Sequence, residues 1–508
     1  MKNKYLFSIS VFFVLYFFRT SACSGITYNV PIQFSTIQAA LNACNNYDTV
    51  LVDPGVYTDT IVWPNKKGLK LLSTGNENNT IIDVQFQGRA LYISFPTYDL
   101  NSTTVIRGFT VRNGFTNQRF GGAVLLENGN FLLEDLIVTH NHCNETGGGF
   151  YISNYNNNLN NVTINRVKIT YNDCITLGRF SEAGGIYSIN TRLTISNSEI
   201  SNNLIQSYSS NSGAGVFVQN TNVNIYNTRI CNNKILFGTP PFYNGGGLFL
   251  AVCDTVLLTN CLIEGNEIQI PSAFSQGSAI NILIAKKIDI NHCTIANNRS
   301  NSLFWNSITI DNVYSIHDIK IRNSIIWSTT ALSELGGNQA MYQVTNCDIK
   351  GFYLGTNCFS LDPVFQDTID YKISYNSPCV ENALLTTPFD IEGNLRPQPI
   401  GTNPDIGCYE IDQNILSSNE LVNVSFLTAY PSIVTDQLNL RINQPLKQPC
   451  SIHIFDESGR CVYQNYFDGT NSDDKIISFD LSALSSGIYN LNVSAGNSII
   501  YSNKILKE

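Results

Sequence analysis

One polar or glycine position recurs about every 31 residues between residues 104 and 349. We name it the bend position, and the distance from one bend position to the next runs from 23 to 33 residues. Its nine occupants are Gly108, Asp135, Arg166, Asn197, Asn227, Asn260, His292, Asn323 and Asn346. A repeat of this length is typical of solenoid proteins, whose repeats bury their apolar faces only against their neighbours.

Apolar residues keep fixed distances from the bend position. Two residues before it stand Ile106, Leu133, Ile164, Ile195, Ile225, Leu258, Ile290, Ile321 and Val344. Three residues after it stand Val111, Val138, Ile169, Ile200, Ile230, Ile263, Ile295, Ile326 and Ile349. The pattern predicts short strands with alternate side chains pointing inward. The change of parity at the bend position predicts a turn between two strands.

A third strand is expected after a pair of small residues that recurs in five coils. These pairs are Gly121-Gly122, Gly148-Gly149, Gly184-Gly185, Ala214-Gly215 and Gly246-Gly247, and each precedes an alternating apolar run. Three short strands per coil would stack on the next coil at about 4.8 Å and share one aliphatic interior. We therefore predict an all-β chain built on a right-handed parallel β-helix solenoid.

Six coils carry an asparagine six residues after the bend position: Asn141, Asn172, Asn203, Asn233, Asn266 and Asn298. We expect these amides to stack, to adopt left-handed turn geometry and to hydrogen-bond along the axis, rather than to bind a ligand. Cys261, Cys293 and Cys347 directly follow the bend position and are predicted to be stacked interior residues, not metal ligands. Cys143 and Cys174 lie one coil apart at equivalent positions, which makes them the first disulfide pairing to test.

Residues 1–22 predict a secretory signal peptide, because Lys2 and Lys4 precede an apolar run and a stretch of small residues. Cys23 follows directly, so lipidation of this residue is left open. Residues 36–44 predict a short amphipathic helix, opened by a sequence around Thr36 that resembles a capping box. Such a helix would cap the N-terminal end of the solenoid, where strand edges would otherwise be open.

Residues 36–57 combine this helix with an apolar strand and an Asp-Pro-Gly-Val-Tyr turn. The stretch resembles the opening of pectin-lyase-like β-helix proteins, and the resemblance covers roughly residues 28–412. Four later blocks, at residues 362–365, 377–379, 390–397 and 405–410, resemble the terminal segment of bacterial surface β-helix proteins of the choice-of-anchor Q type. The resemblance implies a β-helix domain at residues 23–412. Its last part, at about 355–412, would form a turn-rich C-terminal cap in which Arg396 pairs with an acidic neighbour.

A polar linker at residues 413–424 is followed by alternating apolar positions in residues 425–508, with turns at Ser458-Gly459 and Ser486-Gly487. This pattern predicts a small antiparallel β-sandwich. The order of its motifs resembles the C-terminal sorting domain of the type IX secretion system of Bacteroidota, with an immunoglobulin-like accessory module as the alternative. The resemblance implies passage through the periplasm to the outer surface of a Gram-negative bacterium, or release from it. The secretion machinery would then be a partner of residues 425–508.

Composition narrows the functional classes. The net charge is -9 and no clustered basic face is visible, so nucleic acid is not an expected partner. After the signal peptide, no apolar run reaches the roughly 20 residues of a spanning helix. We expect a monomer and no cofactor, with calcium as the one metal left open, because the 14 cysteines fit no zinc motif. Three histidines, His140, His142 and His292, are predicted to be solvated turn residues rather than general bases.

The candidate binding surface consists of the loops between the asparagine positions and the small-residue pairs. These loops differ in length and emerge on one side of the stack, where repeat proteins carry binding sites. They contain Phe180, Tyr208, Phe242, Tyr243, Glu145, Asp173 and Glu182. Aromatic faces and carboxylates together would bind a sugar chain, whereas the alternative is that the aromatic rings only pack their own loops. The three carboxylates would also suit a calcium site or an acid–base pair.

The catalytic motifs of two related enzyme classes are absent. The chain contains neither the Asp-Phe-Ile-Phe-Gly and Gly-Arg-Pro-Trp motifs of pectin methylesterases nor the Asn-Thr-Asp and Gly-His-Gly motifs of polygalacturonases. The sequence therefore favours an exported, non-catalytic β-helix protein that binds a polysaccharide or cell-surface glycan or acts as an adhesin. The alternative is a polysaccharide lyase or glycoside hydrolase acting on an acidic polysaccharide.

Overall fold

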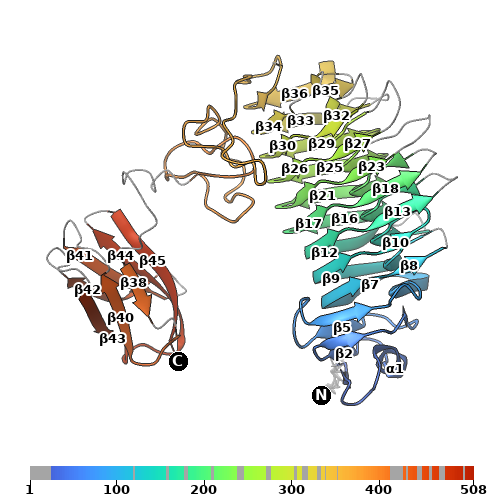
Figure 1. Cartoon of the computed structure of the whole chain (residues 1–508), viewed down its shortest axis with the longest axis horizontal. Helices are drawn as coiled ribbons and strands as arrows, with labels where there is room; N and C mark the ends of the chain where they lie inside the picture. Colours follow the sequence, from blue (N-terminus) through green and yellow to red (C-terminus); the bar gives the residue numbers. More distant parts are fainter. Residues whose placement is uncertain are drawn as a thin grey trace, which may run out of the picture. The chain divides into compact units, whose positions relative to one another are not determined.

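The computed structural model of the protein describes residues 25–117, 120–155, 159–176, 181–207, 211–236, 245–269, 276–301, 306–311, 318–328, 333–337, 339–351, 353–411, 427–430, 433–442, 449–456, 460–467, 475–495 and 498–507. The chain divides into two compact units, Met1–Asn414 and Ile415–Glu508. Nearly all regular structure in both units is β-strand (Figure 1). The predicted fold class is confirmed.

The first unit is a parallel β-solenoid, and two of its strand columns flank the bend position (Figure 1). The pre-bend column contains β1 (Thr27–Val30), β2 (Thr49–Val52), β5 (Lys70–Ser73), β7 (Leu91–Arg112), β9 (Val124–Thr139), β12 (Asn160–Thr170), β16 (Thr191–Ser196), β21 (Asn222–Tyr226), β25 (Cys253–Thr259), β29 (Ala285–Asn291), β33 (Asp318–Arg322) and β36 (Tyr342–Thr345). The post-bend column contains β3 (Gly55–Tyr57), β6 (Thr80–Asp83), the last parts of β7, β9 and β12, β17 (Glu199–Ser201), β22 (Arg229–Cys231), β26 (Leu262–Glu264), β30 (Thr294–Ala296), β34 (Ile325–Trp327) and β37 (Asp348–Ile349).

Two further columns complete each turn. The glycine column follows the small-residue pairs and contains β4 (Ile61–Val62), the first parts of β7 and β9, β11 (Phe150–Ser153), β15 (Ile186–Ile189), β20 (Val216–Gln219), β24 (Leu248–Ala251), β28 (Ile280–Ile282), β32 (Asn306–Ile310) and β35 (Ser333–Gly337). The lateral column follows the asparagines and contains β8 (Phe115–Thr116), β10 (His142–Cys143), β13 (Asp173–Thr176), β18 (Leu204–Ser207), β23 (Lys234–Leu236), β27 (Glu267–Gln269) and β31 (Arg299–Ser300). A short pair, β14 (Ser181–Glu182) and β19 (Asn211–Ser212), and the 3-10 turn η1 (Gln339–Met341) lie between columns.

Seven turns therefore have a fourth strand position, and the expectation of three strands was wrong for these turns. Strands of the lateral column have two to four residues. Each of these strands buries at most one apolar side chain, such as Ile205 or Ile235. A single apolar residue shows no alternation, so the sequence pattern could not reveal this column.

Every bend position has a positive φ. The angle is 87° at Gly108 and lies between 49° and 55° at the other eight positions. Asparagine tolerates this left-handed region better than most residues, because its short amide bonds to the nearby backbone. The apolar positions before and after the bend are buried in one continuous core, as predicted.

The asparagines six residues beyond the bend form a ladder inside the solenoid. Asn172, for example, donates from Nδ2 to Oδ1 of Asn203 at 3.1 Å and to the Val138 carbonyl at 2.9 Å. The structural interpretation is confirmed, but the left-handed residue is the one directly before each ladder position. These residues are His140, Tyr171, Asn202, Asn232, Gly265 and Asn297.

The N-terminal helix α1 (Ile37–Ala43) begins as expected. Thr36 is its N-cap, and the Thr36 hydroxyl accepts a hydrogen bond from the main-chain N–H of Ala39 at 3.1 Å. Ile37 and Leu41 on its inner face are fully buried in the solenoid core. No helix in the described part of the chain is long and apolar enough to cross a membrane.

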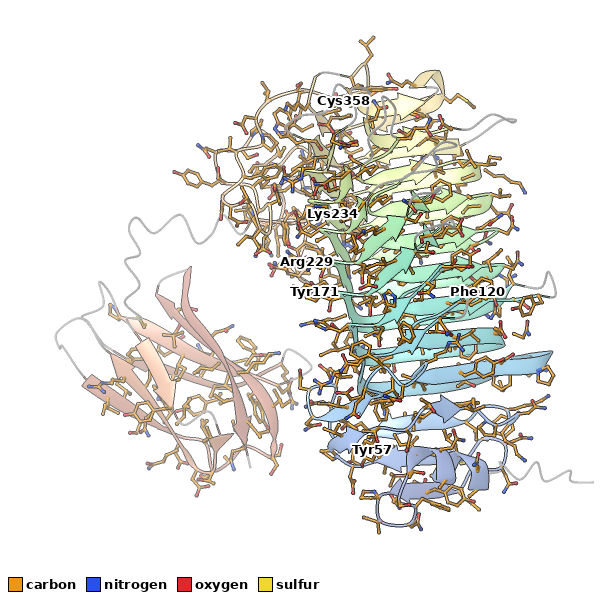
Figure 2. The ribbon with its side chains drawn as sticks, turned by 45° about the vertical axis from the view of Figure 1, so that its right-hand side comes forward. Tyr57, Phe120, Tyr171, Arg229, Lys234 and Cys358 are labelled. Carbon is orange, nitrogen blue, oxygen red and sulfur yellow. The ribbon has the colours of Figure 1, made fainter. Side chains whose placement is uncertain are left out.

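Residues 353–411, here called the strap, do more than cap the solenoid. Thr356 and Phe359 extend the stack by isolated bridges to Thr345 and Asp348. The rest folds over the outer side of the post-bend column, where Cys231, Leu262 and Ala296 are buried with Tyr371, Cys408 and Tyr409. Arg229 on β22, which is labelled in Figure 2, pairs with Asp370 of the strap at 2.7 Å. The expected acidic partner of Arg396 is Glu410, at 3.1 Å.

The second unit contains two small sheets with a shared core. One sheet contains β38 (Leu427–Tyr430), β40 (Gln437–Ile442) and β43 (Lys475–Asp480). The other contains β39 (Ile433–Val434), β45 (Ser498–Lys507), β44 (Gly487–Ala495), β41 (Cys450–Phe455) and β42 (Cys461–Phe467). All pairings except that of β39 with β45 are antiparallel. Apolar side chains of both sheets form one core, which is the predicted sandwich.

Candidate functional site

The four aromatic residues proposed for the loop site, Phe180, Tyr208, Phe242 and Tyr243, lie outside the described residues. The three carboxylates, Glu145, Asp173 and Glu182, are described. Asp173 lies in the lateral column, and Glu145 and Glu182 lie beside it. The surroundings of Asp173 differ from those of the two glutamates.

Asp173 is paired with a histidine. His142 and Asp173 are register neighbours on β10 and β13, and Nδ1 of His142 hydrogen-bonds to Oδ1 of Asp173. The ring of Phe115 stacks on the other side of the imidazole, with 5.4 Å between the ring centres. The hydrogen bond to Asp173 raises the pKa of His142, since it favours the protonated ring.

The other two histidines also have defined surroundings. His140 is exposed, as expected, and its ring stacks on Tyr171 at 5.3 Å. His292 is fully buried, so its assignment as a solvated turn residue was wrong. The strap covers it and places the Leu384 carbonyl 3.3 Å from Nε2. Burial lowers the pKa of His292 well below its ordinary value.

Glu145 and Glu182 lie side by side on neighbouring turns. The main-chain N–H of Glu182 donates to the Glu145 carbonyl at 3.1 Å. Burial alone raises the pKa of Glu182 to about 7. Within the described ranges, no group of three or more His, Cys, Asp or Glu residues could hold a metal ion, so the structure does not gather these carboxylates into a calcium site.

The buried Glu182 carboxyl predicts a pH-dependent stability. The pKa of Glu182 is raised above its unfolded value of 4.5 to about 7, so folding takes up a proton in this window. Its contribution to stability is present below pH 4.5 and is lost as the pH rises through 7. Glu182→Gln is therefore expected to be more stable than the wild type at pH 8.5 and nearly equal to it at pH 5. Urea unfolding at both pH values tests this, and a variant difference independent of pH would contradict it.

Cys143 and Cys174 are register partners on β10 and β13, and both are fully buried. Their thiols are unbonded and share a hydrogen bond, and Sγ of Cys174 also donates to the Ala183 carbonyl at 3.3 Å. A disulfide between them stays a prediction. Cys261, Cys293 and Cys347 are buried in the solenoid interior, as expected for structural residues.

A row of stacked aromatic rings follows the outer side of the glycine column, and our sequence reasoning missed it. Its members are Phe120, Tyr151, Tyr187, Phe217 and Phe249, with ring centres 4.5 to 5.1 Å apart. Each of the last four stands two residues after the second small residue of a pair, which is a signal that the sequence contained. Because neighbouring rings cover each other's faces, and because these four are at most 8% exposed, these four rings pack the solenoid and offer no open face to a sugar.

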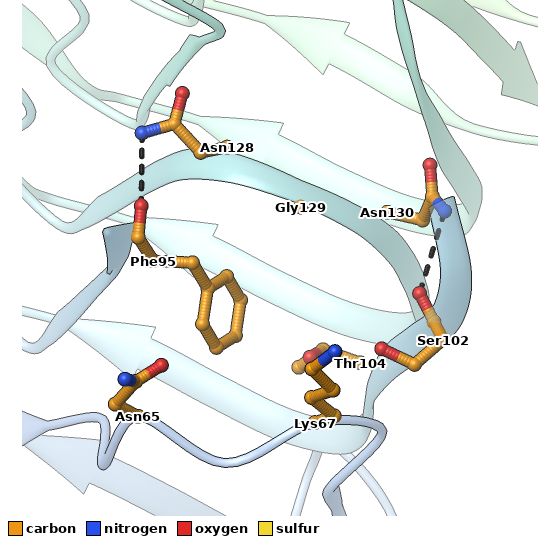
Figure 3. Close-up of a pocket in the computed structure, with 8 residues that line it drawn as sticks. All are labelled: Asn65, Lys67, Phe95, Ser102, Thr104, Asn128, Gly129 and Asn130. Atoms are coloured by element: carbon orange, nitrogen blue, oxygen red, sulfur yellow. Dashed lines mark hydrogen bonds between the residues drawn. The ribbon is translucent and has the colours of Figure 1, made fainter. Parts of the chain in front are cut away.

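A shallow recess opens between the first turns of the solenoid (Figure 3). The residues that line it are Asn65, Lys67, Phe95, Ser102, Thr104, Asn128, Gly129 and Asn130. β7 makes it, because the register between β7 and β9 shifts twice between Ser94 and Thr103. Gly129 leaves room for the Phe95 ring, since a Cβ at this position would lie 2.9 Å from two ring carbons.

Two asparagines of the recess are bonded to its backbone, and a third is exposed to solvent. Asn128 donates from Nδ2 to the Phe95 carbonyl at 3.0 Å, and Asn130 donates to the Ser102 carbonyl at 3.3 Å (Figure 3). These bonds hold the wall formed by residues 128–130. On the opposite wall Asn65 and Lys67 are exposed, and the Phe95 ring between the two walls is half-buried. The recess therefore combines a cation, an open amide and an aromatic ring.

Comparison with known proteins identifies the family of the second unit. Residues 428–508 match the family of secretion system C-terminal sorting domains. No curated protein matches the chain. Among solved structures, the enzymatically active domain of tailspike protein 4 of bacteriophage CBA120 is similar at 11% identity, with a TM-score of 0.18, over 85% of this chain and 60% of that one. The chain thus spans less than two thirds of that neighbour. This protein is a β-solenoid that carries a type IX secretion sorting domain, and it is exported.

Proposed function

We propose that the protein is a cell-surface or secreted β-helix protein that binds an acidic glycan and does not cleave it. The recess is the observation that carries the proposal. An aromatic ring offers an apolar face to the C–H groups of a sugar, an amide offers both a donor and an acceptor, and an ammonium group pairs with a carboxylate. Phe95, Asn65 and Lys67 supply these three groups.

The proposal includes the route of export. We infer that residues 1–22 form a signal peptide, that residues 23–412 form the functional β-helix domain, and that residues 413–424 link it to the sorting domain. The host would be a Gram-negative bacterium of the Bacteroidota, and the blocks of the strap support assignment to the choice-of-anchor Q type. Export places the recess where it meets extracellular polysaccharide, and a monomer suffices for such binding.

Binding to a panel of acidic and neutral oligosaccharides tests the proposal. We expect micromolar to millimolar affinity for oligouronides, which falls as the salt concentration rises because a charge pair is screened. Lys67→Ala and Phe95→Ala are each expected to weaken binding about tenfold, the equivalent of one contact of about 1.4 kcal/mol. Isothermal titration or microscale thermophoresis measures this.

Lys286→Ala is the matched control, because Lys286 is 76% exposed and pairs only with Asp254 in the described structure. Binding that survives in both recess variants would place the glycan elsewhere. Absence of binding to every acidic saccharide would overturn the function itself.

The pair of His142 and Asp173 favours a second candidate, a lyase or hydrolase of acidic polysaccharides. An imidazole oriented by a carboxylate is a common general base. Release of unsaturated or reducing-end products that is lost in His142→Ala would establish this function, whereas a panel without any product would leave the binding function alone.

A further inference from the structure

Two cysteines meet at the C-terminal end of the solenoid. The strap continues the stack there through bridges of Thr345 with Thr356 and of Asp348 with Phe359, both with an offset of 11 residues. The same offset makes Cys347 and Cys358 register partners. The main-chain N–H of Phe359 donates to the Cys347 carbonyl at 3.1 Å, which fixes the two strands at this point. Paired strands lie about 4.8 Å apart, within the range of Cα distances that a disulfide spans.

The two thiols differ in access and in acidity. Cys347 is fully buried, and burial raises the pKa of its thiol. Cys358 is half-exposed, and a hydrogen bond from the Cys347 thiol lowers the pKa of Cys358 to about 7. A thiolate that is both populated at neutral pH and accessible is the reactive partner in thiol–disulfide exchange.

We propose that Cys347 and Cys358 form a disulfide after export, which closes the C-terminal end of the solenoid covalently. The oxidant is the disulfide of a thiol–disulfide oxidoreductase in the exporting compartment. The Cys358 thiolate attacks this disulfide, bonds to one sulfur and releases the other as a thiolate. Cys347 then gives up its proton and attacks Sγ of Cys358, and the second donor sulfur leaves. Two thiols lose two electrons, and the donor becomes a dithiol.

The bond would crosslink the C-terminal end of the solenoid, where the stack of strands ends. The last strand of a stack has an open edge with unpaired backbone groups. Residues 353–359 cover part of this edge, and in the described structure they pair with it through isolated bridges and not through a continuous strand. A crosslink between Cys347 and Cys358 joins the cover to the segment between β36 and β37 and anchors the start of the strap. The other register pair, Cys143 and Cys174, is buried on both sides, so an oxidant reaches neither thiol in the folded chain.

Differential alkylation of the exported full-length protein tests the proposal. Free thiols are blocked under denaturing conditions without reductant, the protein is then reduced, and newly freed thiols receive a second reagent. We expect the second label on Cys347 and Cys358, and a linked peptide of both residues in a non-reduced digest. After mild reduction of the folded protein, Cys358 is expected to react first and Cys347 to stay protected.

The first label on both residues would overturn the proposal, as would a linked peptide that joins either of them to another cysteine. In a second measurement, reduction is expected to lower the thermal midpoint of the solenoid by several degrees in the wild type and in Cys461→Ser, whose cysteine lies exposed in the second unit. The Cys358→Ser variant should show no such shift. An equal shift in Cys358→Ser would also contradict the bond. The outcome is independent of the proposed glycan binding.

Discussion

Replacing Asn203 by alanine is expected to lower the free energy of unfolding of the solenoid by about 4 kcal/mol, because buried polar groups then lose their partners. Nδ2 of Asn203 donates to Oδ1 of Asn233 at 2.9 Å and to the Ile169 carbonyl at 2.9 Å. Its Oδ1 accepts from the main-chain N–H and the Nδ2 of Asn172, both at 3.1 Å. Alanine removes all four bonds in a fully buried place. Denaturant unfolding followed by circular dichroism measures the loss.

Asn202→Gly is the matched control for this variant. Asn202 precedes the ladder position, has φ 56°, and its amide makes one weak bond of 3.3 Å to Ser201. Glycine adopts this φ freely, so we expect a change of less than about 1 kcal/mol. Equal stability of the two variants would show that the ladder contributes no more than an ordinary turn residue.

The sequence predicted those parts of the fold in which every repeat needs the same kind of residue at the same position. A left-handed residue is needed at each bend, and an inward amide is needed at each ladder position, so Asn recurs there with a fixed period. The strap could be predicted only as a terminal segment. The sequence nevertheless contained a sign that the strap covers the outer side of the post-bend column. Leu262 and Ile325 point outward at positions where earlier turns have Lys168 and Glu199. Such apolar outward residues need a cover.

The candidate sites were harder to predict for two different reasons. His142 and Asp173 both stand seven residues after a bend position, so the repeat alone predicts that they are neighbours. We treated them separately because one was assigned to a turn and the other to a loop. The recess could not be predicted, since it depends on the excursion of β7 between Ser94 and Thr103, which breaks the repeat.

The strap is held by a buried ionic centre. Arg396 and Glu410 pair at 3.1 Å with both side chains fully buried. The guanidinium also donates to the carbonyls of Asp405 and Gly407 at 2.9 Å. Glu410 accepts from the main-chain N–H groups of Gln398 and Asp405 at 2.9 and 3.0 Å. Arg396, Asp405 and Glu410 therefore support one another within the strap.

Arg396→Met is expected to destabilise the strap by about 3 to 5 kcal/mol, because it leaves the Glu410 carboxylate buried without its cation. The strap would then open locally while the first turns of the solenoid stay folded, since each turn depends mainly on its neighbours. Limited proteolysis should cut within residues 353–411, and hydrogen exchange at Ile406 and Cys408 should rise. The double variant Arg396→Met/Glu410→Leu removes both charges, and we expect it to recover much of the loss. Equal protease sensitivity of the wild type and the single variant would show that the apolar contacts of Leu262 and Tyr409 alone hold the strap.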